Sequence, residues 1–235
     1  MRTISVIIPA YNEEKRIGKT LEKWQEFLKS KNTGCTIYEI IIIDDGSEDK
    51  TAEIAGSFKN YLPVKIIKIF PNKGKGNAVK AGVFASSGDF IFIYDADAAV
   101  LPEELNKLFL QTNKADIIIG SRTAKEAHTQ MSFARRFVGF CFHLYCLPLL
   151  GNIKDASCGA KLFEKECAQK IFKLQKINRF AFDIEVLWLA KKLNYKIKEV
   201  GVNWKEIPGS KVKVLRDSFE MFFSVLKLYK KQIFG

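Results

Sequence analysis

The sequence predicts an α/β fold in which a mostly parallel central sheet is flanked by helices on both faces. In the first half of the chain, short continuous apolar runs alternate with segments of helical period. Strands that are apolar throughout are typical of sheets buried on both faces, and such sheets are mostly parallel. Polar clusters follow three of these runs. Parallel sheets bind their ligands at the edge formed by the carboxyl ends of the strands, which is where these clusters would lie. The 235 residues suffice for one such domain.

The first half of the chain contains alternating strands and helices. Apolar runs predict strands at Ile4–Ile8, Glu39–Ile43, Val64–Phe70, Phe90–Tyr94 and Ile117–Ile119. The intervening segments predict helices at Glu13–Lys29, Thr51–Phe58, Gly76–Ala85 and Pro102–Thr112. The first of these helices places Ile17, Leu21, Trp24 and Leu28 on one face, which is the spacing of an amphipathic helix.

The second half is less regular. Its pattern predicts an apolar helix at Arg135–Leu150, a loop that enters a strand at Asp155–Phe163, a helix at Ile184–Leu193, a strand at Lys196–Val202, a loop at Trp204–Lys211 and a terminal helix at Val212–Phe234. No repeat or linker divides the chain. We therefore expect one domain over residues 1–211, with halves 1–125 and 126–211, and a C-terminal amphipathic helix over 212–235.

Composition narrows the partners and the compartment. The formal charge is +12, from 38 Lys and Arg against 26 Asp and Glu, which suits a polyanion, an anionic membrane or a phosphorylated ligand. Five irregularly spaced cysteines favour a reducing compartment over a disulfide framework. The N-terminal apolar run is too short for a signal peptide, so a cytoplasmic protein is expected. The uncharged run Phe137–Ile153 is slightly short for a spanning helix of about 20 residues.

Three polar clusters carry the functional prediction. They are Pro9–Glu13, Asp44–Ser47 and Asp95–Asp97, each at a strand end. Asp95 and Asp97 repel one another across Ala96, and a divalent cation with oxygen ligands would offset that repulsion. Each cluster alone could be only a turn or a helix cap. Their convergence on one edge of one sheet favours a single site.

The segment Lys73–Gly76, directly before a helix, could hold phosphate through its backbone N–H groups and a lysine. The chain has no G-x-x-x-x-G-K-[ST] motif, so a P-loop enzyme is not indicated, and it has no G-x-G-x-x-G after the first strand, which weakens a dinucleotide site.

Four segments, in this order and spacing, resemble the nucleotide-sugar-binding half of inverting family 2 glycosyltransferases, which have a GT-A fold. They are SVIIPAYNEE, IIIDDGSEDKT, NKGKGNAVKAG and YDADAAVLPEEL, and they span about the first 125 residues. The second half is similar to the dolichyl-phosphate (polyprenyl-phosphate) glucose and mannose synthases. That likeness is carried by GSR, FARR, DASCGAKLF, FDIE and WKEIPGSKVKVLRDSFEM. The CGAKLF and WKEIPGSK segments are closer to the glucosyl members, which favours glucose over mannose.

The resemblance implies a role for each matched position. A UDP- or GDP-hexose donor would be bound by Pro9, Tyr11, Glu13, Asp45, Asp95, Ala96 and Asp97. Asp95 and Asp97 would form a D-x-D motif that holds Mg²⁺ or Mn²⁺, with Asp97 as the main ligand. The predicted catalytic residues are Asp97, Arg122 and Arg135. Arg122, Arg135 and Lys211 would bind phosphates, including that of the acceptor.

Two departures from the family pattern bear on the donor. Many relatives carry Gln where this chain has Ala99, and mannosyl members often have an Arg where this chain reads Glu206-Ile207-Pro208. The donor sugar therefore stays open at this point.

A polyprenyl phosphate acceptor is already ionised, so it needs cations rather than a general base. Asp183 and Glu185 are reserve candidates for a base. A capped helix with a solvated carboxylate explains them more simply.

The expected function is metal-dependent hexose transfer to a polyprenyl phosphate at the cytoplasmic face of a membrane. A basic amphipathic helix would dock there, with an apolar stripe of Phe219, Phe222, Phe223, Leu226, Tyr229 and Ile233 beside Lys227, Lys230 and Lys231. The alternative is that this stripe packs on the domain.

Two other functions are weighed: a family 2 transferase with a glycan or other hydroxyl acceptor, and a basic nucleic-acid-binding protein without activity. The second is disfavoured because the lysines are spread through amphipathic helices, and no nucleic-acid partner is expected.

Overall fold

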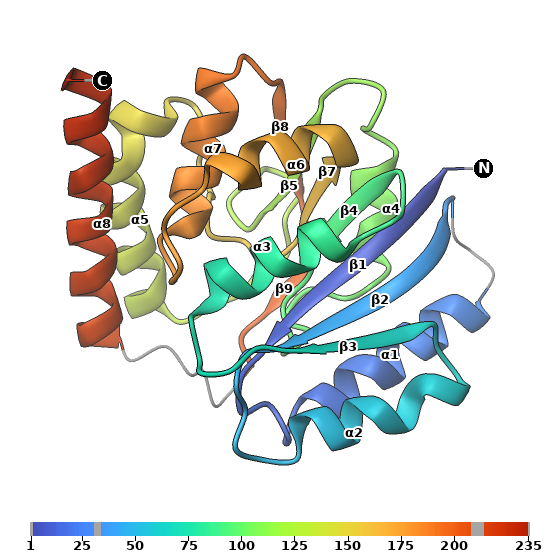
Figure 1. The fold of residues 1–235 in the computed structure, drawn as a ribbon. Coiled ribbons are helices and arrows are strands. Elements are labelled where there is room, and N and C mark those ends of the chain that lie inside the picture. Colours follow the sequence, from blue (N-terminus) through green and yellow to red (C-terminus); the bar gives the residue numbers. More distant parts are fainter. Residues whose placement is uncertain (1, 31–33, 208–213, 235) are drawn as a thin grey trace.

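The computed structural model describes residues 2–30, 34–207 and 214–234, apart from the side chains of residues 134–135, 214–218 and 233–234. Within these residues, the centre is a seven-stranded sheet of order β3-β2-β1-β4-β7-β5-β8 (Figure 1). Its strands are β1 (Thr3–Ala10), β2 (Thr36–Asp44), β3 (Val64–Lys68), β4 (Phe90–Ile93), β5 (Ile117–Ser121), β7 (Lys161–Glu164) and β8 (Ile197–Gly201). Only β7 runs antiparallel to its neighbours, so the predicted mostly parallel sheet is confirmed.

Helices cover both faces of this sheet (Figure 1). They are α1 (Ile17–Lys29), α2 (Thr51–Ser57), α3 (Lys75–Ala85), α4 (Glu104–Phe109), α5 (Phe133–Leu150), α6 (Lys165–Leu174), α7 (Phe182–Lys192) and α8 (Val214–Phe234). A 3₁₀ turn at Phe58–Asn60 follows α2, and a two-residue pair, β6 (Thr129–Gln130) with β9 (Trp204–Lys205), stands apart from the main sheet.

The sheet separates two hydrophobic cores because successive strand residues point to opposite faces. In β1, Val6 and Ile8 join the core formed with α1, whereas Ile7 joins the core formed with α3 and α7. The strand β4 divides in the same way, with Phe92 on the first side and Ile93 on the second. Burial on both faces is why these strands read as continuous apolar runs.

The element boundaries differ from prediction mainly at helix starts. The helix predicted from Glu13 begins at Ile17, because the Glu13 carbonyl accepts hydrogen bonds from Arg16 N and Ile17 N in a preceding turn. Helix α6 was not predicted at all, although it buries Cys167, Ile171 and other residues at helical spacing. The predicted loop from Trp204 begins instead with β9, which pairs with β6.

The strand order creates a topological switch point, with its crevice, between β1 and β4. The chain passes from β1 outward to β2 and β3 and then returns to β4 on the other side of β1. Ligands of open α/β sheets bind at such a switch point, outside the carboxyl ends of the strands. Here the end of β1 and the loop after it carry Pro9–Glu13, and the loop after β4 carries Asp95–Asp97.

The C-terminal helix lies beside α5 at one side of the molecule (Figure 1). It packs through Val225 and Leu228, which are buried, and the ring of Phe222 stacks on Tyr145 at 4.7 Å. Phe219, Phe223 and Leu226 remain exposed, so only part of the predicted stripe packs on the domain. The predicted domain boundary at residue 211 lies outside the described residues. Among the described helices, none combines the length and apolarity needed to cross a bilayer.

Candidate active site

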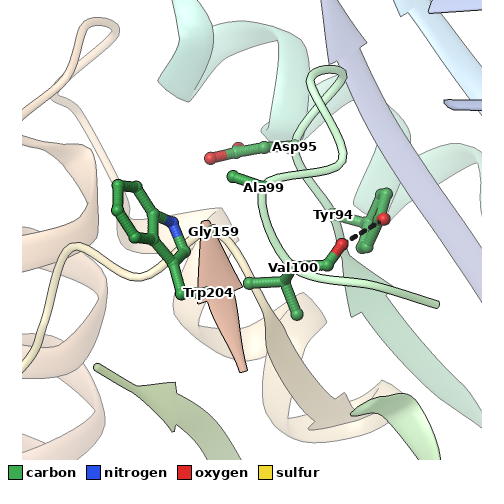
Figure 2. Close-up of a pocket in the computed structure, with 6 residues that line it drawn as sticks. All are labelled: Tyr94, Asp95, Ala99, Val100, Gly159 and Trp204. Atoms are coloured by element: carbon green, nitrogen blue, oxygen red, sulfur yellow. Dashed lines mark hydrogen bonds between the residues drawn. The ribbon is translucent and has the colours of Figure 1, made fainter. Parts of the chain in front are cut away.

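The loop after β4 places two carboxylates at the crevice. Thr20 Oγ1 of α1 donates to Ala96 O at 2.7 Å, and within the loop Asp97 Oδ1 accepts from Ala99 N at 3.0 Å. Tyr94 is buried beneath the loop, and its hydroxyl donates to Val100 O (Figure 2). These contacts fix the backbone of the loop that carries Asp95 and Asp97.

A small pocket opens in front of Asp95. It is lined by Tyr94, Asp95, Ala99, Val100, Gly159 and Trp204, and Figure 2 shows the Asp95 side chain directed toward the side on which Gly159 and Trp204 lie. Ala99 is part of the pocket wall.

Gly159 is required by the position of Asp95. The antiparallel register that pairs Ile93 with Lys161 brings Gly159 opposite Asp95 when it is continued by two residues. A β-carbon on Gly159 would lie 2.1 Å from Asp95 Oδ2, which is far inside van der Waals contact. The Asp95 carboxylate occupies the space that the β-carbon of any residue other than glycine would need at position 159.

Replacing Gly159 by alanine should therefore displace Asp95. We expect a loss of about 1–3 kcal/mol in the free energy of unfolding from overpacking, together with weaker Mn²⁺-dependent binding of UDP, measured by calorimetry. Gly139→Ala is the matched control, because nothing lies within 4 Å of a β-carbon there. Unchanged metal-dependent binding in Gly159→Ala would contradict the assignment.

Asp95 is paired with a lysine that sequence analysis did not connect to it. Lys75, the first residue of α3, places Nζ 2.6 Å from Asp95 Oδ1 and 5.9 Å from the ring centroid of Phe182. Burial raises the pKa of Asp95, but the Lys75 ammonium, with Lys161 and Arg122, outweighs it and holds that pKa below its usual range. Burial and the charge of Asp95 raise the pKa of Asp97. The two carboxylates thus differ in environment.

The phosphate role predicted for the backbone of Lys73–Gly76 is wrong for two of its N–H groups. Asp45 accepts from Lys73 N at 2.9 Å and from Gly74 N at 2.7 Å, so these donors are already satisfied by a buried carboxylate. Burial raises the pKa of Asp45 despite these bonds. Asp45 fixes the loop that aims Lys75 at Asp95.

The loops after β1 and β2 are joined to each other. Asn12 N donates to Ser47 Oγ at 2.9 Å, and Glu13 N donates to Thr51 Oγ1 at 2.7 Å. The structure thus brings the Pro9–Glu13 and Asp44–Ser47 clusters together at the predicted edge. Tyr11 is exposed there, whereas the buried carboxylate of Glu13 pairs with Arg16.

Arg122 is held by an acidic partner. Its Nε and Nη2 donate to the two oxygens of Asp155 at 2.8 and 2.7 Å, and its backbone N donates to the same carboxylate at 2.7 Å. Burial raises the pKa of Asp155, but the Arg122 guanidinium outweighs it and holds that pKa below its usual range. The guanidinium carbon also lies 5.6 Å from the ring centroid of Trp204, which lines the pocket in front of Asp95.

The reserve bases are not solvated, which corrects that prediction. Asp183 is buried and accepts from Lys161 Nζ at 2.6 Å, and Lys161 is itself almost fully buried. Glu185 is also buried and accepts from Lys176 N at 2.9 Å and Ile177 N at 2.6 Å. Both carboxylates are therefore engaged by donors of the protein itself rather than solvated.

Two further predicted site residues, Arg135 and Lys211, have side chains that the structure does not describe. Arg135 lies in the first turn of α5, and its side chain is not described. Lys211 lies outside the described residues. Sequence analysis missed Gly159, Asp155 and Lys161 as site residues, and it placed Lys75 in a possible phosphate-binding segment without its pairing to Asp95. Each of the four lies in a segment that carried the resemblance.

Comparisons with known proteins agree with this geometry. The sequence matches the model of Glycosyl transferase family 2 over residues 5–172. The dolichyl-phosphate beta-glucosyltransferase of Dictyostelium discoideum is 39% identical over 99% of this chain and 75% of its own length. The proteins of that name from Mus musculus and Homo sapiens are 39% and 36% identical, each over 90% of this chain and 70% of their length.

Solved structures show the same fold. Glucosyl-3-phosphoglycerate synthase from Mycobacterium tuberculosis, in complex with UDP, superposes with a TM-score of 0.68 over 96% of this chain and 78% of that one, at 20% identity. The same enzyme in complex with Mn²⁺ and UDP-glucose also gives 0.68, over 96% and 77%, at 19% identity. The predicted GT-A arrangement is confirmed. Because the sequence matches the family model over 5–172 and its relatives extend along nearly all of it, the chain belongs to glycosyl transferase family 2.

Proposed function

We propose that this glycosyltransferase moves glucose, with inversion, from UDP-glucose to dolichyl phosphate or a related polyprenyl phosphate. The observation that carries the proposal is the set of cations around the D-x-D motif. Lys75 lies 2.6 Å from Asp95, and Lys161 and Arg122 are close enough to lower the pKa of that carboxylate. Such a site suits two anionic phosphates at once.

The relatives support glucose and a lipid phosphate. Each of the three relatives named above is a dolichyl-phosphate beta-glucosyltransferase, which agrees with the glucosyl character of CGAKLF and WKEIPGSK. The structural neighbour bound to UDP-glucose supports a UDP donor. The non-enzymatic nucleic-acid alternative is not supported, because the family is one of transferases.

The residues present fit a divalent cation. Within the described residues, no three His, Cys, Asp or Glu side chains gather where they could hold a metal by themselves. Asp95 and Asp97 supply two carboxylates, and Mg²⁺ or Mn²⁺ commonly takes its remaining ligands from substrate phosphates and water. The raised pKa of Asp97 reflects burial and the crowding of two negative charges, and a cation would relieve that crowding. When bound, the metal would stabilise the charge that grows on the departing diphosphate.

In the proposed reaction, an ionised oxygen of the lipid phosphate attacks C1 of glucose. The new bond forms on the face opposite the bond to UDP, which breaks and leaves UDP as the product. No proton has to be removed from the acceptor, which agrees with the engaged state of Asp183 and Glu185. Arg122 and Arg135 would hold the acceptor phosphate beside the donor, and Lys211 would assist.

The test uses two matched acceptors. The purified protein is incubated with radiolabelled UDP-glucose, Mn²⁺ or Mg²⁺, and either a short polyprenyl phosphate or the alcohol of the same chain length in detergent. We expect label in the lipid product only with the phosphate, and only without EDTA; GDP-mannose should be a poor donor. Transfer to the alcohol would favour the hydroxyl-acceptor alternative and refute the proposal.

We also propose that the protein docks on the cytoplasmic face of a membrane through one apolar face of α5 and α8. This α5–α8 face consists of exposed side chains, namely Phe133, Phe137, Val138, Phe140, Leu144, Leu147, Phe219, Phe222, Phe223 and Leu226. Lys227 and Lys230 are exposed on the same C-terminal helix. Apolar side chains beside lysines are typical of helices that lie on anionic lipid.

Charge reversal of Lys227 and Lys230 to Glu should weaken docking. Each lysine near an anionic surface contributes about 1 kcal/mol, so flotation with phosphatidylserine vesicles should need at least about tenfold more lipid. Lys231 is left unchanged because its Nζ lies 4.0 Å from the buried Glu185. The control is Lys19→Glu with Lys29→Glu on α1, where both lysines are exposed and the helix covers the other face of the sheet. Equal loss in both variants would contradict docking through α8.

A further inference from the structure

The ammonium of Lys75 lies against one of the two carboxylates of the D-x-D motif. Its Nζ lies 2.6 Å from Asp95 Oδ1, and the lysine side chain is only 21% exposed. A divalent cation that binds this carboxylate would lie close to the ammonium, and because like charges repel, metal binding and the Lys75–Asp95 ion pair oppose one another.

The backbone that carries Lys75 is fixed. Asp45 binds the N–H groups of Lys73 and Gly74. Gly74 and Gly76 also pack against the neighbouring loop so tightly that a β-carbon would lie 2.6 Å from Asn178 O and 2.5 Å from Ile177 O, respectively. Release of Asp95 must therefore come from rotation of the long lysine side chain rather than from movement of its loop.

Asp95 is equally constrained. Gly159 lies against Oδ2, and the register between β4 and β7 holds the two segments together. A nucleoside diphosphate bound at this edge of the sheet would bring several negative charges, and these would offer Lys75 a second anionic partner.

We propose that Lys75 is the resident counter-cation of Asp95 and couples metal binding to nucleotide binding. Without nucleotide, the lysine competes with the metal for Asp95. When a nucleoside diphosphate binds, Lys75 turns to a phosphate oxygen and leaves Asp95 to the metal. The inference rests on the metal site of the proposed function. It predicts that metal and nucleotide bind cooperatively, each strengthening the binding of the other by the same factor.

The test measures Mn²⁺ binding directly, by the electron paramagnetic resonance signal of free Mn²⁺, with and without saturating UDP. In the natural protein we expect UDP to raise Mn²⁺ affinity at least about tenfold. In Lys75→Met, Mn²⁺ should bind about tenfold tighter without UDP, and the enhancement by UDP should shrink by about tenfold. Lys75→Arg keeps the positive charge and should behave like the natural protein.

Lys73→Met is the matched control, because it removes the same charge from an exposed position on the same loop. If it tightened Mn²⁺ binding as much as Lys75→Met, the effect would be one of general charge, and the proposal would be overturned. It would also be overturned if Lys75→Met bound Mn²⁺ no tighter than the natural protein. A different result, no Mn²⁺ binding by the natural protein even with UDP, would refute the proposed metal site itself, and the Lys75 proposal would fall with it.

Discussion

Replacing Asp97 by alanine is expected to lower kcat/KM for transfer to lipid phosphate by about 10³-fold, because the metal supplies several kcal/mol of transition-state stabilisation and each 1.36 kcal/mol is tenfold in rate. Asp97 is the carboxylate of the pair that the structure leaves without an ammonium at ion-pair distance among the described residues. Steady-state assays at several Mn²⁺ concentrations would measure the loss. Asp95→Asn should have a smaller effect on both transfer and metal-dependent donor binding.

The control for Asp97→Ala is Glu22→Ala, which removes an exposed carboxylate in the middle of α1. It should leave transfer unchanged. Thermal unfolding should show that Asp97→Ala folds, since removing one of two crowded carboxylates relieves repulsion. Near-normal turnover by Asp97→Ala would show that the metal reading of the motif is wrong.

Replacing Arg122 by alanine should damage both stability and acceptor use. Asp155 would remain buried without its partner, and breaking such a pair typically costs about 3–5 kcal/mol. Loss of a charge-assisted contact to the lipid phosphate should cost about 1.5–3 kcal/mol more in the transition state for transfer. Urea unfolding measures the first effect, and transfer kinetics with a short polyprenyl phosphate measure the second.

The double variant Arg122→Ala with Asp155→Ala separates the two effects. It removes the stranded carboxylate, so most of the stability should return while acceptor use stays impaired. A double variant with normal kinetics would make Arg122 a purely structural residue. Loss of UDP affinity equal to the loss of acceptor use would assign Arg122 to the donor side instead.

The sequence by itself determined the strands of the first half of the chain, their alternation with helices and the positions of the carboxylates. A strand that is buried on both faces has apolar residues at nearly every position, as in Glu39–Ile43. This pattern is local, so it can be recognised without knowing which strands lie on either side. Because parallel strands end at one edge, the convergence of the Pro9–Glu13 and Asp95–Asp97 clusters also followed from the chain alone. The family resemblance added the assignment of donor and metal.

Only the tertiary structure decided which charges meet. A strand of four residues, such as β7, does not encode its neighbours or its direction, and its antiparallel insertion between β4 and β5 is what brings Gly159 against Asp95 and Lys161 near the site. The pairs Lys75–Asp95, Lys161–Asp183 and Arg122–Asp155 join residues far apart in sequence. Their electrostatics depend on distance and burial, and these quantities exist only once the chain is folded.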